Sequence, residues 1–309
     1  MNSKEKSFIN LIKVYAKGAN KYIGDDCAIF EKEGFLVSTD SLIEDVHFSS
    51  KTEPYYLGWK AAAVNISDIA SMGGIPQYYL LSASLPRRCN EKWIQEFIRG
   101  TNECCDLYDV QLVGGDLTKG DKIYLCGTIL GKTFKSRVAK RSFASPKQKV
   151  VVSGKFGNSA AGLWSIENMK TDRYPEQFEA HIKPIPRVKE GQNLLSKNKN
   201  KIAMMDASDG LFDCLEQISQ QSRVKIKINF DAIPISSKLL VCAKEARVNY
   251  EDWVLAGGED YELVATTYEP YDTLHWYEIG EVYEGEGVEI KKDGVILNVD
   301  ALKSFEHFC

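Results

Sequence analysis

The stretch PYYLGWKAAAVNISDIASMG, residues 54–73, decides the fold class. Its alanine-rich, apolar pattern and its length predict a helix. Strand-like runs lie on both sides of it, FLVSTDSL at 35–42 and YYLLSASLP at 78–86. Strands interleaved with helices of these lengths are typical of α/β or α+β domains, in which helices cover a sheet. The sequence therefore predicts an α/β (α+β) fold.

The same alternation continues along the rest of the chain. The strand-like runs VQLVGG (110–115) and KIYLCGTILG (122–131) follow a helical stretch at 90–108. The polar stretch KRSFASPKQK (140–149) contains a proline and predicts a domain boundary. We predict two domains, residues 1–145 and 146–309. The elements of the second are expected within 150–163, 202–219, 224–230, 261–268 and a hairpin at 289–298 around Asp-Gly.

Composition sets broad limits on function. The 309 residues carry a net charge of −4, and 44% are hydrophobic and 27% charged. These values are typical of a soluble globular protein and speak against extended nucleic-acid binding. No apolar run reaches the length of a membrane span. The N-terminal stretch predicts an amphipathic helix instead of a secretory signal, and its apolar side consists of Phe8, Leu11, Ile12 and Tyr15.

Eight cysteines are scattered along the chain, and none has the spacing of a zinc ligand pair. In a chain without a secretory signal, they predict reduced thiols and a cytoplasmic protein. Most of them are expected to be small core side chains.

Aspartates recur at the edges of the predicted elements, and each has an ordinary explanation as a helix cap or turn residue. That explanation is weakest for Asp68, which lies inside the alanine-rich helix with Asn65 on the same face. The two residues predict either close approach to a polar ligand or a plain solvent-facing stripe, with equal weight. Similarly, the pair Asp25 and Asp26 in YIGDDCAIF (22–30) fits a turn or a site.

Carboxylates that converge on one point repel each other unless a cation neutralises them. Asp40 follows Ser38 and Thr39 at the end of a strand, where α/β proteins often bind ligands. Oxygen ligands without histidine or cysteine favour Mg²⁺, which is usually bound together with phosphates. The loop around Gly154 and Gly157 is a weaker signal for phosphate binding, because the P-loop pattern is absent.

Eight motifs in a fixed order resemble those of thiamine-monophosphate kinases, a family in the superfamily of aminoimidazole ribonucleotide synthetase. They span residues 22–308, which is nearly the whole chain. The motifs are IGDDCAIF, VSTDSLIEDVHF, KAAAVNISDIASMGG, LVGGDLTKG, VSGKFGNSAAGL, MMDASDGL, LAGGEDYEL and SFEHF.

The resemblance implies ATP-dependent phosphorylation of thiamine monophosphate to thiamine diphosphate, with several Mg²⁺ ions as cofactors. It implies an N-terminal sheet domain that forms a homodimer and a C-terminal α+β domain. The implied Mg²⁺ ligands are Asp26, Ser38, Thr39, Asp40, Asp68, Asp116, Asp206 and Asp209. The implied ATP contacts are Gly115, Asp116, Arg141 and Ser208, and the residues implied to face the thiamine substrate are His47, Glu259 and Phe305.

Several of these residues also have plain structural readings. Arg141 fits a solvated charge at a domain boundary, His47 fits a satisfied strand histidine, and Glu259 fits the end of a turn. Phe305 fits a docking anchor. The chain also departs from the family pattern at FASPKQK (143–149) and at Asn158, where the family commonly has aspartate.

The implied acceptor is a phosphate with a second pKa of about 6, so it is already largely an anion at neutral pH. Positioning and charge neutralisation then matter more than proton removal. We therefore predict direct in-line transfer without a general base and without a phosphoenzyme. Because neighbouring residues entering a strand point to opposite faces, one aspartate of the pair is expected to serve the metal site. The resemblance selects Asp26 and leaves Asp25 for the turn.

Two alternatives to this function remain at this point. One is another ATP-dependent enzyme of the superfamily, such as an aminoimidazole ribonucleotide synthetase. Hydrogenase-maturation proteins of the same superfamily end in a functional cysteine after Pro-Arg. This chain ends in FEHFC, so we interpret Cys309 as incidental. The other alternative is a nucleotide-binding protein without turnover, although retention of six candidate aspartates argues against it.

Overall fold

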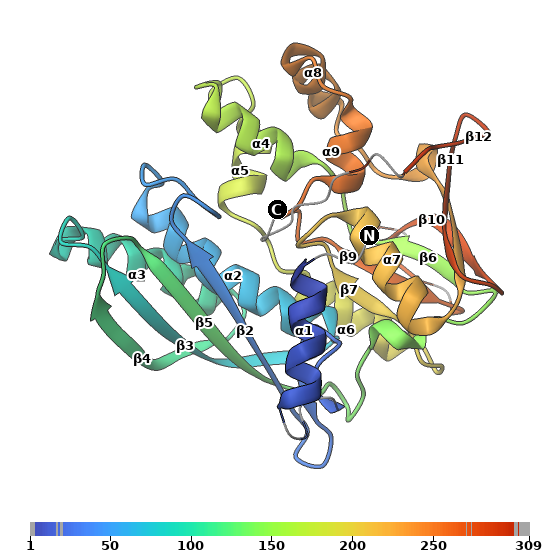
Figure 1. Ribbon diagram of the computed structural model, residues 1–309, viewed down its shortest axis with the longest axis horizontal. Helices are drawn as coiled ribbons and strands as arrows, with labels where there is room; N and C mark the ends of the chain where they lie inside the picture. Colours follow the sequence, from blue (N-terminus) through green and yellow to red (C-terminus); the bar gives the residue numbers. More distant parts are fainter. Residues whose placement is uncertain are drawn as a thin grey trace.

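The computed structural model describes residues 4–16, 18, 21–269, 271–272, 274–299 and 302. The chain forms two sheets, each accompanied by its own helices (Figure 1). The first sheet has the strand order β1-β2-β5-β3-β4, and the second has the order β12-β11-β8-β10-β6-β9-β7. This mixed architecture confirms the predicted α/β class.

The elements of the first half match the predicted runs closely, with ends that differ by a few residues. They are α1 (Lys4–Tyr15), β1 (Ala28–Phe30), β2 (Phe35–Ile43), α2 (Pro54–Ser71), β3 (Ile75–Leu85), α3 (Glu91–Leu107), β4 (Gln111–Lys119) and β5 (Tyr124–Lys132). Strand β5 pairs antiparallel with β2 and β3, and β3 pairs parallel with β4. The parallel pair is possible because α3 carries the chain back between β3 and β4.

Helices α2 and α3 lie along one face of the first sheet (Figure 1). Side chains that point to this face alternate along the strands, and Leu36, Tyr79 and Ile129 are fully buried there. The two helices touch at glycines. A Cβ on Gly58 would lie 1.9 Å from the Phe97 carbonyl oxygen, and a Cβ on Gly100 would lie 1.9 Å from that of Tyr55. Only glycine permits this backbone approach.

The second half also follows the predicted order of elements. They are η2 (Arg141–Phe143), β6 (Lys149–Val152), α4 (Asn158–Glu167), α5 (Pro175–Ile182), α6 (Val188–Lys197), β7 (Met204–Asp206), α7 (Leu211–Ser222), β8 (Lys225–Asn229), η3 (Phe230–Ala232), α8 (Ser237–Ala246), α9 (Tyr250–Ala256), β9 (Leu263–Thr267), β10 (Tyr277–Tyr283), β11 (Gly287–Lys292) and β12 (Val295–Ile296). The predicted Asp-Gly hairpin is confirmed, since β11 and β12 are antiparallel and Asp293 and Gly294 have φ values of 49° and 78°.

The altered stretch 143–149 forms a turn that is anchored by a buried glutamine. Gln148 is fully buried, and its Oε1 accepts hydrogen bonds from the backbone N–H of Ser145 at 2.7 Å and from Thr266 Oγ1 at 2.8 Å. Its Nε2 donates to the carbonyl oxygen of Lys201 at 3.0 Å. The departure from the family pattern is therefore accommodated by a satisfied polar side chain. The domain boundary near residue 145 stays a prediction.

Helix α1 forms as predicted, and its apolar side is largely exposed. Phe8, Leu11, Ile12 and Tyr15 are between 42% and 80% exposed. All seven cysteines in the described ranges are free thiols, and five of them are buried. Every helix in these ranges is too short or too polar to cross a membrane.

Candidate active site

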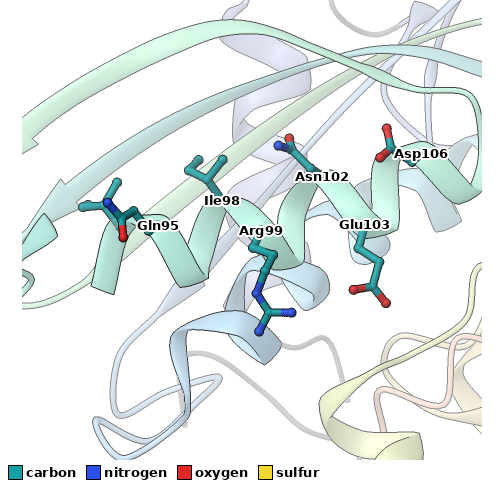
Figure 2. Close-up of a pocket in the computed structure, with 7 residues that line it drawn as sticks. Gln95, Ile98, Arg99, Asn102, Glu103 and Asp106 are labelled. Atoms are coloured by element: carbon teal, nitrogen blue, oxygen red, sulfur yellow. The ribbon is translucent and has the colours of Figure 1, made fainter. Parts of the chain in front are cut away.

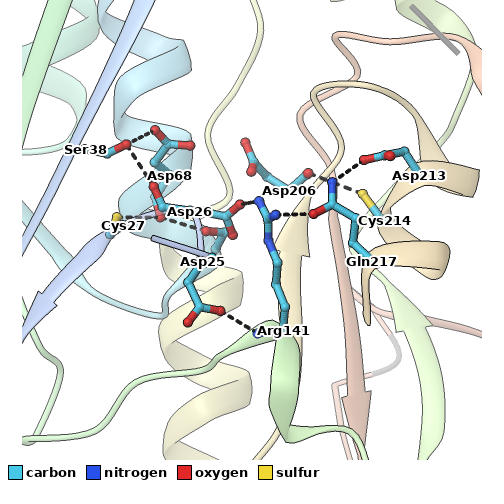
Figure 3. Close-up of polar contacts among 12 residues, drawn as sticks. Asp25, Asp26, Cys27, Ser38, Asp68, Arg141, Asp206, Asp213, Cys214 and Gln217 are labelled. Carbon is cyan, nitrogen blue, oxygen red and sulfur yellow. Dashed lines mark hydrogen bonds and ion pairs between the residues drawn. The ribbon is translucent and has the colours of Figure 1, made fainter. Parts of the chain in front are cut away.

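Three carboxylates from distant parts of the sequence meet between the two sheets. Asp26 lies just before β1, Asp68 lies on α2, and Asp206 ends β7. Each offers an oxygen atom, and these atoms lie within 4.8 Å of one another. Figure 3 shows the three side chains converging from both halves of the chain. The structure thus brings together three of the predicted site residues.

Serine hydroxyls hold two of these carboxylates in place. Ser38 Oγ donates to Asp68 Oδ2 at 2.5 Å, and Ser67 Oγ donates to Asp206 Oδ2 at 2.5 Å. Ser67 comes from α2, so one helix orients carboxylates on both sides of the site. The sequence prediction missed Ser67, although its position next to Asp68 was a usable signal.

Two buried thiols, Cys27 and Cys214, donate to the backbone carbonyl oxygens of Asp68 and Asp206, each at 3.3 Å.

The carboxylates are crowded and poorly solvated, which disfavours their charged forms. Burial, and then the charge of Asp26, raises the pKa of Asp206 to about 8 and that of Asp40 to about 6. Burial, and then Asp40, raises the pKa of Asp68 well above its ordinary value. A cation at this point would reverse these shifts, because it would favour the ionised carboxylates.

Arg141 brings a positive charge into contact with this cluster, and its guanidinium forms an ion pair with Asp26 and a hydrogen bond with Gln217. Burial opposes the charge of Arg141, but Asp26 raises the pKa of its guanidinium. The other oxygen of Asp26, Oδ2, is buried and has no hydrogen-bond partner. An orphaned carboxylate oxygen among hard oxygen donors fits Mg²⁺. The idea of a solvated boundary charge does not fit Arg141.

Asp25 and Asp26 point to different partners (Figure 3). Asp25 Oδ1 accepts the backbone N–H of Arg141 at 2.8 Å, while Asp26 faces the cluster. The placement agrees with a structural Asp25 and a site residue Asp26. Asp68 and Asn65 do not form a solvent-facing stripe, because Asn65 is 1% exposed and its Oδ1 accepts the backbone N–H of Asp40 at 3.2 Å.

Ser208 and Asp209 lie in the loop between β7 and α7, next to the cluster residue Asp206. Asp209 does not cap α7, because Gly210 occupies the cap position and no side-chain capping bond forms there. The Ser208 carbonyl oxygen accepts the backbone N–H of Glu259 at 2.6 Å. The loop therefore joins the acidic cluster to the loop that carries Glu259.

Thr39, Gly115 and Asp116 lie apart from the cluster. Thr39 Oγ1 donates to the Gly127 carbonyl oxygen at 2.6 Å, on the sheet face away from α2. Asp116 pairs with Ser82 on the edge strand β4, and alternation along the strands places its side chain on that same open face. Three strand spacings, roughly 14 Å, separate Thr39 from β4. Within one chain, the structure does not bring these residues to the Asp26 cluster.

Glu259 joins a second polar cluster, with Lys60 and His181. Lys60 Nζ lies 2.8 Å from Glu259 Oε1, and His181 Nδ1 lies 3.5 Å from Oε2. Burial alone would raise the pKa of Glu259, but the charge of Lys60 lowers it. His47 lies in a turn after β2, not in a strand, and its Nδ1 accepts the backbone N–H of Ile43 at 3.0 Å. Phe305 and Cys309 lie outside the described residues.

The glycine-rich loop before α4 is already bound by an acid of the chain itself. Asp260 accepts the backbone N–H groups of Gly157 at 2.6 Å and Ser159 at 2.9 Å. A phosphate at this helix start would have to displace that carboxylate. Asn158, one of the two departures from the family pattern, lies at this helix start, and its Oδ1 accepts a hydrogen bond from Gln177 Nε2 at 3.2 Å. Like the stretch 143–149, it has a structural contact of its own.

A hollow of about 670 Å³ lies elsewhere, along the outer face of α3. Figure 2 shows its labelled side chains, all from that single helix and including Gln95, Arg99 and Glu103. Acids from different elements do not converge there. The cluster of Asp26, Asp68 and Asp206 is the better candidate site on chemical grounds.

The fold and the acidic cluster define the chain as an AIR synthase-related protein. Residues 24–133 match the family model "AIR synthase related protein, N-terminal domain". The chain is 38% identical over 257 residues to the thiamine-monophosphate kinase of Bacillus subtilis (strain 168), covering 79% of this chain and 76% of that protein. It is 35% identical over 293 residues to that of Aquifex aeolicus (strain VF5), covering 92% and 93%.

A solved structure agrees with these relatives. The chain matches "AaThiL complexed with AMPPCP and TMP" with a TM-score of 0.89 and 32% sequence identity, covering 99% of this chain and 97% of that one. The chain belongs to the thiamine-monophosphate kinase family.

Proposed function

We propose that this chain transfers the γ-phosphoryl group of ATP to thiamine monophosphate, giving ADP and thiamine diphosphate. The observation that carries the proposal is the meeting of Asp26, Asp68 and Asp206 between the two halves, in a chain of this family. Phosphoryl transfer depends mainly on positioning and on stabilising negative charge, and a convergent acidic site suits both.

The proposed Mg²⁺ ligands are Asp26, Ser38, Asp40, Asp68, Asp206 and Asp209. When bound, Mg²⁺ would neutralise phosphate charge and hold the reacting groups in place. The chain supports these ligands with its own hydrogen bonds, since Ser38 orients Asp68 and Ser67 orients Asp206. Arg141 would exchange its contact with Asp26 for an ATP phosphate, to which a planar guanidinium is well suited.

The remaining roles follow the family motifs. Ser208 would contact ATP, because its loop directly follows Asp206. His47, Glu259 and Phe305 would face the thiamine substrate. The carboxylate of Glu259 is kept ionised by Lys60, which suits an amino-bearing, cationic heteroaromatic compound.

The transfer itself needs no base from the chain. A phosphate oxygen of thiamine monophosphate attacks the γ-phosphorus, and the bond to the bridging oxygen of ADP breaks. The attacking oxygen is largely deprotonated at neutral pH. We propose direct in-line transfer without a phosphoenzyme.

We further propose that two copies pair through the open face of the first sheet, and that the protein acts in the cytoplasm. Tyr78 on β3 and Tyr124 on β5 are 42% and 41% exposed on this face. Thr39 and Asp116 also lie there, too far apart to share one ion within a chain. In a pair, Gly115 and Asp116 of one copy would reach the ATP site of the other copy, which lies at its Asp26 cluster.

The experiment that tests the function measures ADP release with Mg²⁺ and one acceptor at a time: thiamine monophosphate, thiamine, or the aminoimidazole precursor. We expect turnover with thiamine monophosphate alone. Turnover with the aminoimidazole precursor would indicate the sister enzyme, and ATP binding without turnover would indicate a binding protein.

A further inference from the structure

A buried lysine on α2 lies directly beside the proposed substrate contact Glu259. The Lys60 side chain is 5% exposed, and its Nζ lies 2.8 Å from Glu259 Oε1. A lysine is rarely buried unless it is paired, because removing its charge from water is costly. The pair links the helix that covers the first sheet to a loop of the second half.

Glu259 is held in one conformation by contacts on both sides. Its backbone has a φ of 64°, which is unusual for a residue other than glycine, and its N–H donates to the Ser208 carbonyl oxygen at 2.6 Å. His181 contacts the second carboxylate oxygen, and burial followed by Lys60 lowers the pKa of His181 to about 3. The histidine is therefore neutral, so Lys60 supplies the positive charge.

The exposure of the pair is asymmetric. The Glu259 side chain is 24% exposed, whereas that of Lys60 is 5% exposed. Glu259 is therefore the more accessible member of the pair. Lys60, the more buried partner, positions the Glu259 carboxylate and keeps it ionised.

Helix α2 also sets the distance from this pair to the acidic cluster. Ser67, which orients Asp206, follows Lys60 by seven residues, or nearly two turns, on the same side of the helix. The rise along the axis is about 10 Å. Helix α2 therefore sets the distance between Ser67, which orients Asp206, and Lys60, which orients Glu259.

We propose that Lys60 is a positioning residue for acceptor recognition. It fixes the Glu259 carboxylate at a set distance from the phosphoryl-transfer site, and the ring end of the acceptor binds this carboxylate. This inference rests on the proposed function, in which Glu259 faces the thiamine substrate. Lys60 itself does not touch the acceptor.

The test is steady-state kinetics of the full chain with Lys60→Met, which keeps most of the length of the unbranched side chain and removes its charge. We expect the KM for thiamine monophosphate to rise about tenfold, while the KM for ATP stays within about twofold. Lys60→Arg, which keeps the charge, should restore much of the lost acceptor affinity. Lys183→Met is the control, because Lys183 also contacts α2, through Tyr55, but pairs with Glu103 instead of Glu259.

A double-mutant cycle with Glu259→Gln separates positioning from general packing. If Lys60 acts through Glu259, the double variant should bind the acceptor no worse than Glu259→Gln alone. Circular dichroism and thermal unfolding check that each variant folds. If Lys60→Met does not fold, the cycle is run with Lys60→Gln and Lys60→Arg.

The outcomes distinguish the inference from the function on which it rests. Equal rises in both KM values, or additive effects in the cycle, would overturn the role of Lys60 while wild-type turnover leaves the function intact. A wild-type chain that fails to phosphorylate thiamine monophosphate would overturn both.

Discussion

At the scale of single residues, two adjacent aspartates have separate tasks. Asp26 contributes to the carboxylate cluster, and Asp25 accepts the backbone N–H of Arg141. Asp26→Asn keeps the shape but removes the charge, so we expect turnover to fall by at least about a hundredfold, as when a charge-stabilising group is lost. Asp25→Asn keeps an acceptor for the N–H and should cost less than about tenfold.

Steady-state turnover of both variants, with circular dichroism as the folding control, checks this prediction. Equal catalytic losses in two folded variants would show that the division between the neighbours is wrong.

At the scale of elements, the contact between α2 and α3 depends on glycine. Gly100→Ala should gain up to about 1 kcal/mol from helix propensity alone. The added Cβ would lie 1.9 Å from a backbone oxygen, which cannot move without shifting a helix. Overpacking typically costs about 1–3 kcal/mol, so we expect a net loss of stability.

Denaturant unfolding measures this loss, and Asn102→Ala at an exposed position of α3 is the control for propensity. An increase in stability for Gly100→Ala would mean that the helices can separate at no cost.

The elements themselves could be predicted from sequence, but the long-range contacts of their loops could not. Apolar runs and the Asp-Gly turn located the strands and the hairpin, because these are local signals. Asp26, Asp68 and Asp206 could be nominated from the family motifs. That Lys60 pairs with Glu259 across 199 positions depends on how the two halves pack, and that Asp260 binds the start of α4 depends on packing within the second half. Nothing in the local sequence around Asp116 reveals which sheet face it occupies.

At the scale of the whole molecule, the acidic cluster links pH, metal and stability. The pKa of Asp206 rises from 3.8 to about 8 in the folded chain. A carboxyl group whose pKa is higher in the folded than in the unfolded state contributes its full stabilisation at pH values below its pKa in the unfolded state. This contribution is lost as the pH rises through its pKa in the folded state. Without divalent cations, the contribution of Asp206 to the free energy of unfolding therefore declines as the pH rises from 3.8 to about 8.

Thermal unfolding of wild type and Asp206→Asn tests this linkage. Without metal at about pH 8, the asparagine variant should be the more stable, and its advantage should shrink toward about pH 5. Excess Mg²⁺ should stabilise the wild type more than the variant, because the metal binds the folded state. A constant gap at all pH values, with no Mg²⁺ effect, would contradict the cluster's role.

Pairing through the open sheet face also belongs to this scale. Tyr78→Arg places a charge in the proposed interface and should shift the protein toward a monomer, because an unpaired buried charge is costly. Leu240→Arg on α8 is a control with similar exposure, 44% against 42%. Analytical ultracentrifugation decides the matter, and a monomeric wild type would refute the pairing.

The most direct test of the central claim follows the γ-phosphoryl group of labelled ATP through a single turnover with Mg²⁺ and thiamine monophosphate. Direct transfer predicts that the label appears in thiamine diphosphate and that acid-quenched protein carries none at any time point. Label on the protein before it reaches the product, or label only in inorganic phosphate, would contradict the account.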